Sequence, residues 1–417
     1  MISDPAAPRA ATAHRPTDIG IEGVRGAAAL FVGLSHLFYV NIATPALHLP
    51  ALLRNLEAGH GGVLVFFVLS GYVISWTNTK ACTPAAARSY VQRRSVRLVP
   101  IYMAAMLLTL VAIRVSGLAE TSRVIIGSFL CLQNFNGYFG FSLNPPRANV
   151  PLWSLNFEVL YYGLFVILWR YRPSLGWVFL PTLAAGILGW FAPQIMPLFI
   201  SSYACGWLFW ASGWWLARQP ILGEPRASTP LASWLLLVFA SHHINGVVRV
   251  MNVFHLYSDD SGMVSIGDLG LIPSILLVLG AVTHRRLPHR GAIEATAWAL
   301  CIVPISGMIW THRLFSNAGW VVGAATTLLA VLLLPWRSTQ WLRPFAWFGG
   351  ISYAFYVVHY PLLYLVRSAP FPTSTWEGFA ERSVVWVALA IGLSWLLEKR
   401  FQPWIKGRLM HSDKPST

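Results

Sequence analysis

Residues 97–115 read RLVPIYMAAMLLTLVAIRV, and this stretch decides the fold class. No side chain between Arg97 and Arg114 carries a charge, and a cation stands at each end of the run. A transmembrane helix needs about 20 mostly apolar residues. The stretch therefore predicts a membrane-spanning helix with basic flanks.

Similar apolar windows recur along the whole chain. About twelve are found, and the one most interrupted by polar or helix-breaking residues contains Glu294 and Pro304. The windows cover residues 24–43, 60–77, 97–115, 151–169, 174–191, 195–216, 230–247, 264–283, 292–311, 318–335, 345–366 and 382–398. They predict an all-α protein, a polytopic integral membrane helix bundle of about 10–12 transmembrane helices.

The composition agrees with a membrane protein and excludes an ordinary soluble enzyme. Of the 417 residues, 56% are hydrophobic and only 11% are charged, against about 25% charged in an average soluble domain. The four cysteines are far apart and form no C-x-x-C pair. The sequence therefore indicates no disulfide framework and no zinc or other metal site.

The basic residues predict the orientation of the bundle. Of the 30 Lys and Arg residues, 22 fall in the termini and alternate loops that make up one side, and the side richer in Lys and Arg is cytoplasmic. Both termini are therefore expected in the cytoplasm, with residues 1–20 as a disordered tail and residues 399–417 as a C-terminal tail. Topology accounts for most of the net charge of +15, so no nucleic-acid partner is predicted. The expected location is the cell (inner) membrane, as a multi-pass protein in the lipid bilayer.

Ionisable residues inside the membrane are expensive and usually mark a functional site or an internal ion pair. His36, Glu158 and His359 are expected at similar depths near the middle of the bilayer. Asp268 is expected near the outer edge, where a vestibule or helix-capping role is at least as plausible. Two histidines and a glutamate at one level predict that His36, His359 and Glu158 form a site. Ser154 lies four residues before Glu158 on the same helix face, and this polar stripe is expected to face the bundle interior.

Arginines at the cytoplasmic side form a second candidate site. Arg25 lies on the same helix face as His36, because eleven residues at about 100° each return to within roughly 20°. Arg94 and Arg97, next to Arg93, project together from the start of one helix. Paired guanidinium groups suit phosphate oxygens, although from the residues alone snorkelling toward anionic lipid is the slightly better explanation.

Six motifs, in order, resemble the acyltransferase 3 family of integral membrane enzymes. They are GVRG at 23–26 with His36 after it, FFVLSGY at 66–72, RSVRLVP at 94–100, PLWSLNFE at 151–158, ISYAFYVVHYP at 351–361 and EKRF at 398–401. The resemblance implies a membrane acyltransferase domain over residues 21–398. It also implies transfer of an acyl group, usually acetyl, from cytoplasmic acyl-CoA to a hydroxyl of a sugar, cell-surface polysaccharide or glycosylated metabolite.

The resemblance also suggests roles for the site residues. His36, with Arg25 and Glu158, is expected to act in catalysis, His36 as general base or as transient acyl carrier and Glu158 orienting either His36 or the acceptor. Acyl-CoA is the expected co-substrate, with no permanently bound cofactor, and its phosphates are assigned to three arginines. These cofactor-binding residues are Arg93, Arg94 and Arg97. The expected substrate-binding residues are Ser70, Tyr72, Trp153, Ser154 and His359.

Two other function classes remain open from sequence. A proton-coupled secondary transporter would explain His and Glu inside about twelve helices, although no matching halves are visible. A polyprenyl-sugar glycosyltransferase is suggested only by Asp259 and Asp260, two adjacent acids that are suited to a divalent metal. The sequence does not fix the acceptor, the acyl group or the oligomeric state.

Overall fold

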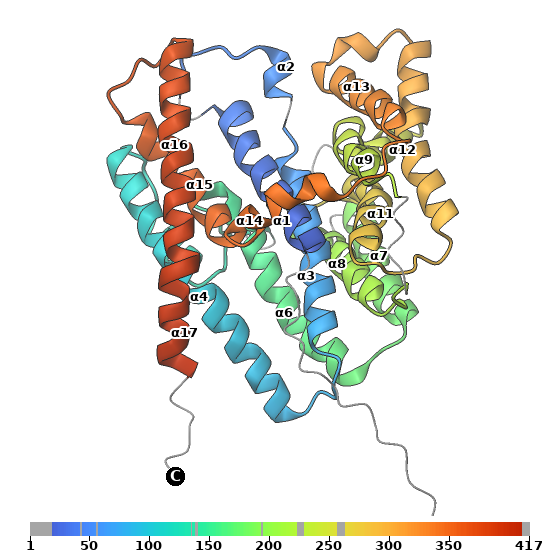
Figure 1. Ribbon diagram of the computed structural model, residues 1–417, viewed down its shortest axis with the longest axis horizontal. Helices are drawn as coiled ribbons and strands as arrows, with labels where there is room; N and C mark the ends of the chain where they lie inside the picture. Colours follow the sequence, from blue (N-terminus) through green and yellow to red (C-terminus); the bar gives the residue numbers. More distant parts are fainter. Residues whose placement is uncertain are drawn as a thin grey trace, which may run out of the picture.

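The computed structural model describes residues 19–41, 44–55, 57–134, 136–137, 141–192, 195–222, 229–256 and 263–410. Within these residues the chain is an all-α bundle, apart from one two-stranded antiparallel ribbon (Figure 1). The helices of the first half are α1 (Ile19–Ser35), the π-turn η1 (His36–Val40), α2 (Ala51–Arg54), α3 (Gly59–Thr77), α4 (Pro84–Val115), α5 (Ser122–Phe129), the 3₁₀ turn η3 (Arg147–Leu152), α6 (Trp153–Tyr171), α7 (Leu175–Phe191) and α8 (Leu198–Ala217). The ribbon pairs β1 (Asn136–Gly137) with β2 (Phe141–Ser142).

The second half continues in the same way. Its helices are α9 (Leu231–Ile244), α10 (Gly246–Val253), the 3₁₀ turn η4 (Ile266–Leu271), α11 (Ile272–Val282), α12 (Arg290–Trp310), the 3₁₀ turn η5 (Leu314–Ser316), α13 (Ala318–Leu332), the 3₁₀ turn η6 (Gln340–Leu342), α14 (Arg343–Gly349), α15 (Ser352–Arg367), α16 (Trp376–Leu396), the π-turn η7 (Leu397–Phe401) and α17 (Gln402–Met410). Each of the twelve apolar windows contains a helix, so the all-α polytopic fold is confirmed.

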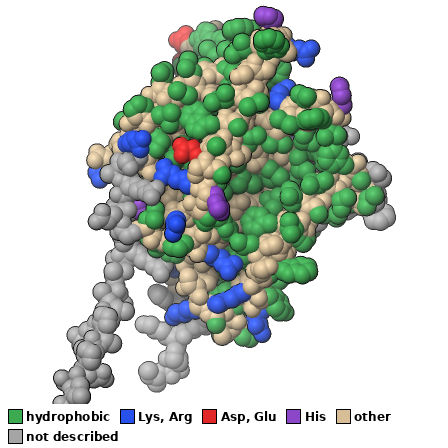
Figure 2. All heavy atoms as spheres, turned by 90° about the vertical axis from the view of Figure 1, so that its right-hand side faces the viewer, with side chains coloured by type: hydrophobic (Ala, Val, Ile, Leu, Met, Phe, Trp, Pro, Cys, Tyr) green, Lys and Arg blue, Asp and Glu red, His purple; other side chains and the backbone are tan. Residues whose placement is uncertain are grey.

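Seven helical segments are long and apolar enough to cross a membrane, and three shorter apolar helices accompany them. The interrupted window at 292–311 is one of the seven. Large apolar side chains point outward from these helices: Val303 is 63% exposed, Trp310 86% and Val384 69%. Figure 2 shows a continuous hydrophobic area on one flank of the molecule. So large an exposed apolar surface is typical of contact with lipid.

Two windows are divided where a single helix was expected. Residues 345–366 form α14 and α15, which are separated at Gly350 and Ile351. Residues 264–283 begin as η4, because Asp268 forms a capping box with Ser265, and continue as α11. The C-terminal tail expected at 399–417 is helical as far as Met410, and residues 1–18 and 411–417 lie outside the described part.

The ends of the helices separate as the charge count predicts. In Figure 1 the connection from α3 to α4, the end of α6 and α17 lie at the lower end of the bundle, and α2 and the start of α16 lie at the upper end. The lower end is therefore the predicted cytoplasmic end, and the upper end is the predicted outer end. Close packing of α3 on α8 holds the centre, since a Cβ on Gly71 would clash with the Trp210 carbonyl and one on Gly213 with the Val68 carbonyl.

Candidate functional site

A cavity of about 230 Å³ opens between α1, α3, α4, α6 and α15. Three arginines, one carboxylate and several hydroxyl groups make its wall polar inside an apolar bundle. The polar lining residues are Arg25, Ser70, Arg94, Arg97, Ser154, Glu158, Tyr162, Ser352, Tyr353 and Tyr356. The sequence-predicted stripe of Ser154 and Glu158 therefore faces the interior, as lipid exposure would be costly.

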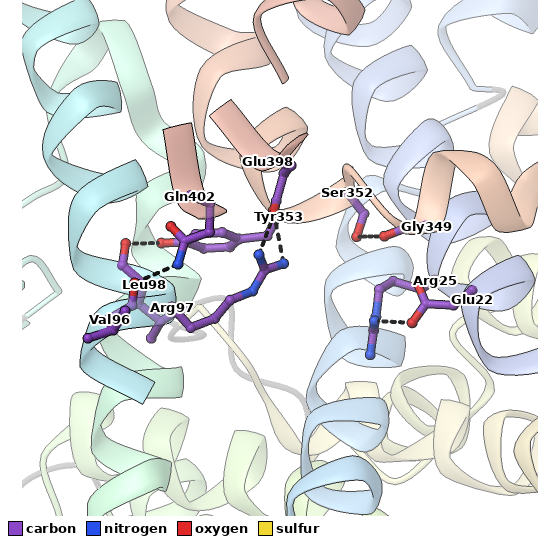
Figure 3. A network of polar contacts seen from close by, with 10 residues as sticks. All are labelled: Glu22, Arg25, Val96, Arg97, Leu98, Gly349, Ser352, Tyr353, Glu398 and Gln402. Atoms are coloured by element: carbon purple, nitrogen blue, oxygen red, sulfur yellow. Dashed lines mark hydrogen bonds and ion pairs between the residues drawn. The ribbon is translucent and has the colours of Figure 1, made fainter. Parts of the chain in front are cut away.

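Two of the three arginines in the cavity wall are paired with carboxylates (Figure 3). Arg25 donates to Glu22 one turn away, at 2.5 Å. Arg97 forms a two-pronged ion pair with Glu398, whose side chain is only 3% exposed. Glu398 comes from η7, about 300 residues away in sequence, so this pair joins the C-terminal helices to α4.

Arg94 differs from the other two arginines because its guanidinium group lies over aromatic rings. Its guanidinium carbon lies 5.8 Å from the ring centre of Tyr90 and 5.5 Å from that of Tyr162. Among the described residues, no carboxylate is within ion-pair distance of Arg94. Cation–π contacts leave the charge of the guanidinium group in place, so Arg94 is the cavity arginine whose charge is not offset by a directly bonded carboxylate.

Arg93 does not belong to the cavity, contrary to the sequence-based assignment. Its side chain is exposed and donates to Ser89 Oγ at 2.6 Å, one turn earlier on α4. Adjacent residues on a helix point about 100° apart, so Arg93 cannot project with Arg94 into the same space.

Glu158 is held by hydroxyl groups and not by a histidine. Its Oε1 accepts from Ser70 Oγ at 3.1 Å and from Tyr162 Oη. Within the described residues, Glu158 makes no hydrogen bond to His36, so the structure does not show the contact through which it would orient that histidine. The carboxylate remains on the cavity wall, where its expected role near an acceptor or donor group is still a prediction.

His36 is paired instead with His359. The distance from His36 Nδ1 to His359 Nε2 is 2.8 Å, and the rings stack with centres 5.1 Å apart. His36 lies in the π-turn that ends α1, whereas His359 is fully buried on α15. Neither lines the cavity, so the substrate-binding role assigned to His359 is not what its contacts show.

Backbone contacts of His359 fix the proton positions in this pair. Its Nδ1 lies 2.8 Å from the Tyr356 carbonyl and 3.0 Å from the Phe355 carbonyl. Carbonyls only accept, so Nδ1 must carry the proton, and Nε2 of the neutral ring is an acceptor. His36 Nδ1 must then donate to it, and in neutral His36 the Nε2 atom keeps its lone pair.

The cavity ends one helical turn from this histidine pair. Tyr356 on the cavity wall precedes His359 by three residues, about 4.5 Å along α15. Its Oη lies 2.7 Å from Ser154 Oγ and donates to the Pro151 carbonyl at 2.7 Å. Tyr356 and Ser154 thus form the boundary between the arginine-lined cavity and the histidines.

Three sequence-predicted residues lie elsewhere. Tyr72 is buried against Arg285, which donates to its hydroxyl at 3.3 Å, and does not line the cavity. Trp153 is buried and stacks on His60, and Asp268 pairs with the same histidine. The acids Asp259 and Asp260 of the glycosyltransferase alternative lie outside the described residues.

Sequence reasoning missed Tyr162, Tyr356 and Glu398 as partners of the site. Tyr162 follows Glu158 by one helical turn, so the spacing alone could have predicted their contact. Tyr356 and Glu398 both lie within the family motifs, but their contacts depend on tertiary packing between segments far apart in sequence.

A model of the acyltransferase 3 family, described as an acyltransferase domain, matches residues 18–399. The chain belongs to this family. The match covers nearly the whole of the described structure, including every residue of the cavity and both histidines. Searches of curated proteins and of solved structures found no significant match.

As an acyltransferase 3 member, the chain is a multi-pass membrane acyltransferase. Along α15 the arginine-lined cavity comes within one helical turn of the histidine pair. A cavity with three arginines in its wall and an imidazole pair one helical turn beyond it suits a substrate with an anionic group. The arrangement can therefore bring an activated acyl group and a base together.

Proposed function

We propose that this membrane acyltransferase moves an acyl group, most simply acetyl, from cytoplasmic acyl-CoA to a hydroxyl of a sugar, polysaccharide or glycosylated metabolite. The observation that carries the proposal is the cavity lined by Arg25, Arg94 and Arg97 that ends one turn from the His36–His359 pair. The CoA phosphates lie near Arg94, and the pantetheine arm extends toward Tyr356. The thioester then comes within reach of His36.

His36 acts as the general base in this proposal. Its Nε2 takes the proton of the acceptor hydroxyl, the oxygen attacks the thioester carbonyl, and the carbon–sulfur bond breaks. The proton then passes from His36 to the departing CoA thiolate, so no net proton is gained or lost. His359 keeps Nε2 of His36 unprotonated by accepting from Nδ1, which is the support that Glu158 was expected to give.

Purified protein in detergent tests the proposal directly. Acetyl-CoA-dependent formation of an acetylated hydroxyl product, followed by mass spectrometry and by release of free CoA thiol, is the expected result. A proton-coupled transporter would form no such product, so failure to release CoA under any acceptor condition would contradict the enzyme assignment.

Arg94→Gln is expected to raise KM for acyl-CoA about tenfold or more, because it removes a cation from the cavity wall and a hydrogen bond to a charged group contributes about 1.5–3 kcal/mol. Initial rates against acetyl-CoA concentration measure the change. Arg93→Gln is the matched control, since it removes the same charge from the neighbouring exposed position and should leave KM unchanged. Equal effects of the two variants would show that general surface charge, and not this cavity, attracts the donor.

A further inference from the structure

A second group of ionisable side chains lies toward the predicted outer end of the bundle. It contains two carboxylate–histidine pairs: Glu57 with His242 at 3.3 Å, and His60 with Asp268 at 3.1 Å. These four residues, here called the acid–histidine cluster, come from the segment before α3, from α3, from α9 and from η4. The rings of His60 and His242 are 6.2 Å apart, so the two pairs are neighbours.

The cluster reaches the proposed base through one serine. Ser35 Oγ donates to Glu57 Oε2 at 2.6 Å, and Ser35 directly precedes His36. His60 precedes the cavity residue Ser70 on α3 by about 15 Å of helix. The acid–histidine cluster therefore reaches the histidine pair through Ser35, whereas the arginine-lined cavity approaches it through Tyr356.

Helix capping explains the position of only one of the four side chains, Asp268. Asp268 caps η4 through Oδ2, which leaves its Oδ1 for His60. Glu57 and His60 cap no helix, and their side chains are 24% and 28% exposed, so the bundle does not fully enclose them. Ionisable groups inside a membrane bundle usually mark a functional site or an internal ion pair.

The chemistry of the cluster fits a molecule with several hydroxyl groups. Carboxylates accept hydrogen bonds from hydroxyls, whereas imidazoles donate or accept, so alternating pairs can satisfy neighbouring hydroxyls. The positive charge that an anionic donor needs is provided in the cavity by Arg94. The cluster and the cavity therefore differ in the ligand that they favour.

We propose that the acid–histidine cluster of Glu57, His60, His242 and Asp268 binds the acceptor, a polyhydroxylated molecule such as a sugar unit, at a site separate from the acyl-CoA cavity. The proposal rests on the acyl transfer proposed above and adds the position of the acceptor. One hydroxyl of the bound sugar then faces His36 Nε2 while others are held by Glu57 and His60.

Steady-state kinetics with two varied substrates tests the proposal. Acetyl-CoA is the donor, and the acceptors are the methyl glycosides of glucose, galactose, mannose and rhamnose, with the fastest used for the variants. Glu57→Gln and His60→Gln are each expected to raise KM for the glycoside about tenfold, because each weakens a hydrogen bond that involves a charged or strongly polar group. KM for acetyl-CoA should stay within about twofold of wild type, as expected for sites that bind separately.

Matched controls come from the same predicted outer side. Glu377→Gln changes an exposed carboxylate at the start of α16, and His48→Gln changes an exposed histidine before α2. Both should leave KM for the glycoside unchanged.

An unchanged glycoside KM in the cluster variants, or an equal rise in both KM values, would overturn the acceptor assignment. Wild-type protein that releases CoA but acetylates none of the four glycosides would also overturn it. Wild-type protein that releases no CoA at all would instead contradict the proposed acyl transfer.

Discussion

Replacing His36 by Gln is expected to lower kcat for acyl transfer by about 10³-fold, because a positioned general base contributes roughly 10²–10⁴-fold. Glutamine keeps a hydrogen-bond donor toward His359 but has no basic nitrogen. The measurement is acetyl-CoA-dependent product formation by purified protein at matched concentrations. His48→Gln, which changes an exposed histidine, is the control and should retain wild-type activity.

His359→Ala separates positioning from chemistry. Since His359 Nε2 accepts from His36 Nδ1, its loss frees the His36 ring to rotate and to change tautomer. A misplaced catalytic group costs on the order of 10²-fold, so kcat should fall by less than in His36→Gln while KM for acetyl-CoA is unchanged. Full activity of both variants would remove the histidine pair from the mechanism.

The ion pair between Arg97 and Glu398 gives the second large expected effect. Arg97→Gln leaves the Glu398 carboxylate buried at 3% exposure without its partner. Breaking a buried pair in this way typically costs about 3–5 kcal/mol, and the lower end applies here because Arg97 itself is 41% exposed. We expect a marked drop in the unfolding temperature, followed by the fluorescence of the 20 tryptophans in detergent.

The double variant provides the internal check on that effect. Glu398→Gln alone should cost less, since the remaining arginine is partly solvated. The variant with both Arg97→Gln and Glu398→Gln carries no buried charge and should unfold at a higher temperature than Arg97→Gln alone. Additive losses would show that the two side chains do not act as a pair.

Arg94 and Arg97 belong to one motif but are expected to have different roles. Arg94 contributes charge to the cavity, whereas Arg97 ties α4 to η7 and has most of its charge neutralised. Arg94→Gln should therefore raise KM for acetyl-CoA with little change in the unfolding temperature. Arg97→Gln should lower the unfolding temperature with little change in that KM. The spacing of three residues placed both on one helix face but carried no information about their partners.

The pattern of apolar residues was enough to predict the helices. A run of about 20 apolar residues can satisfy its backbone hydrogen bonds in lipid only as a helix. The pattern also placed Ser154 and Glu158 on one interior face, because residues four apart on a helix lie together. The hydrophobic pattern did not predict the break between α14 and α15 after Gly349 or the π-turn that begins at His36. Both depend on how neighbouring segments pack.

The sequence by itself determined the all-α membrane fold, the separation of charge between the two ends and several of the polar residues inside the bundle, such as Glu158 and His359. Only the tertiary structure decided which of them meet: His36 with His359, Glu158 with Ser70 and Tyr162, and Arg97 with Glu398. Depth along a helix follows from a rise of about 1.5 Å per residue. The rotation of each helix, and hence its partner, is set by side-chain packing between segments up to about 300 residues apart.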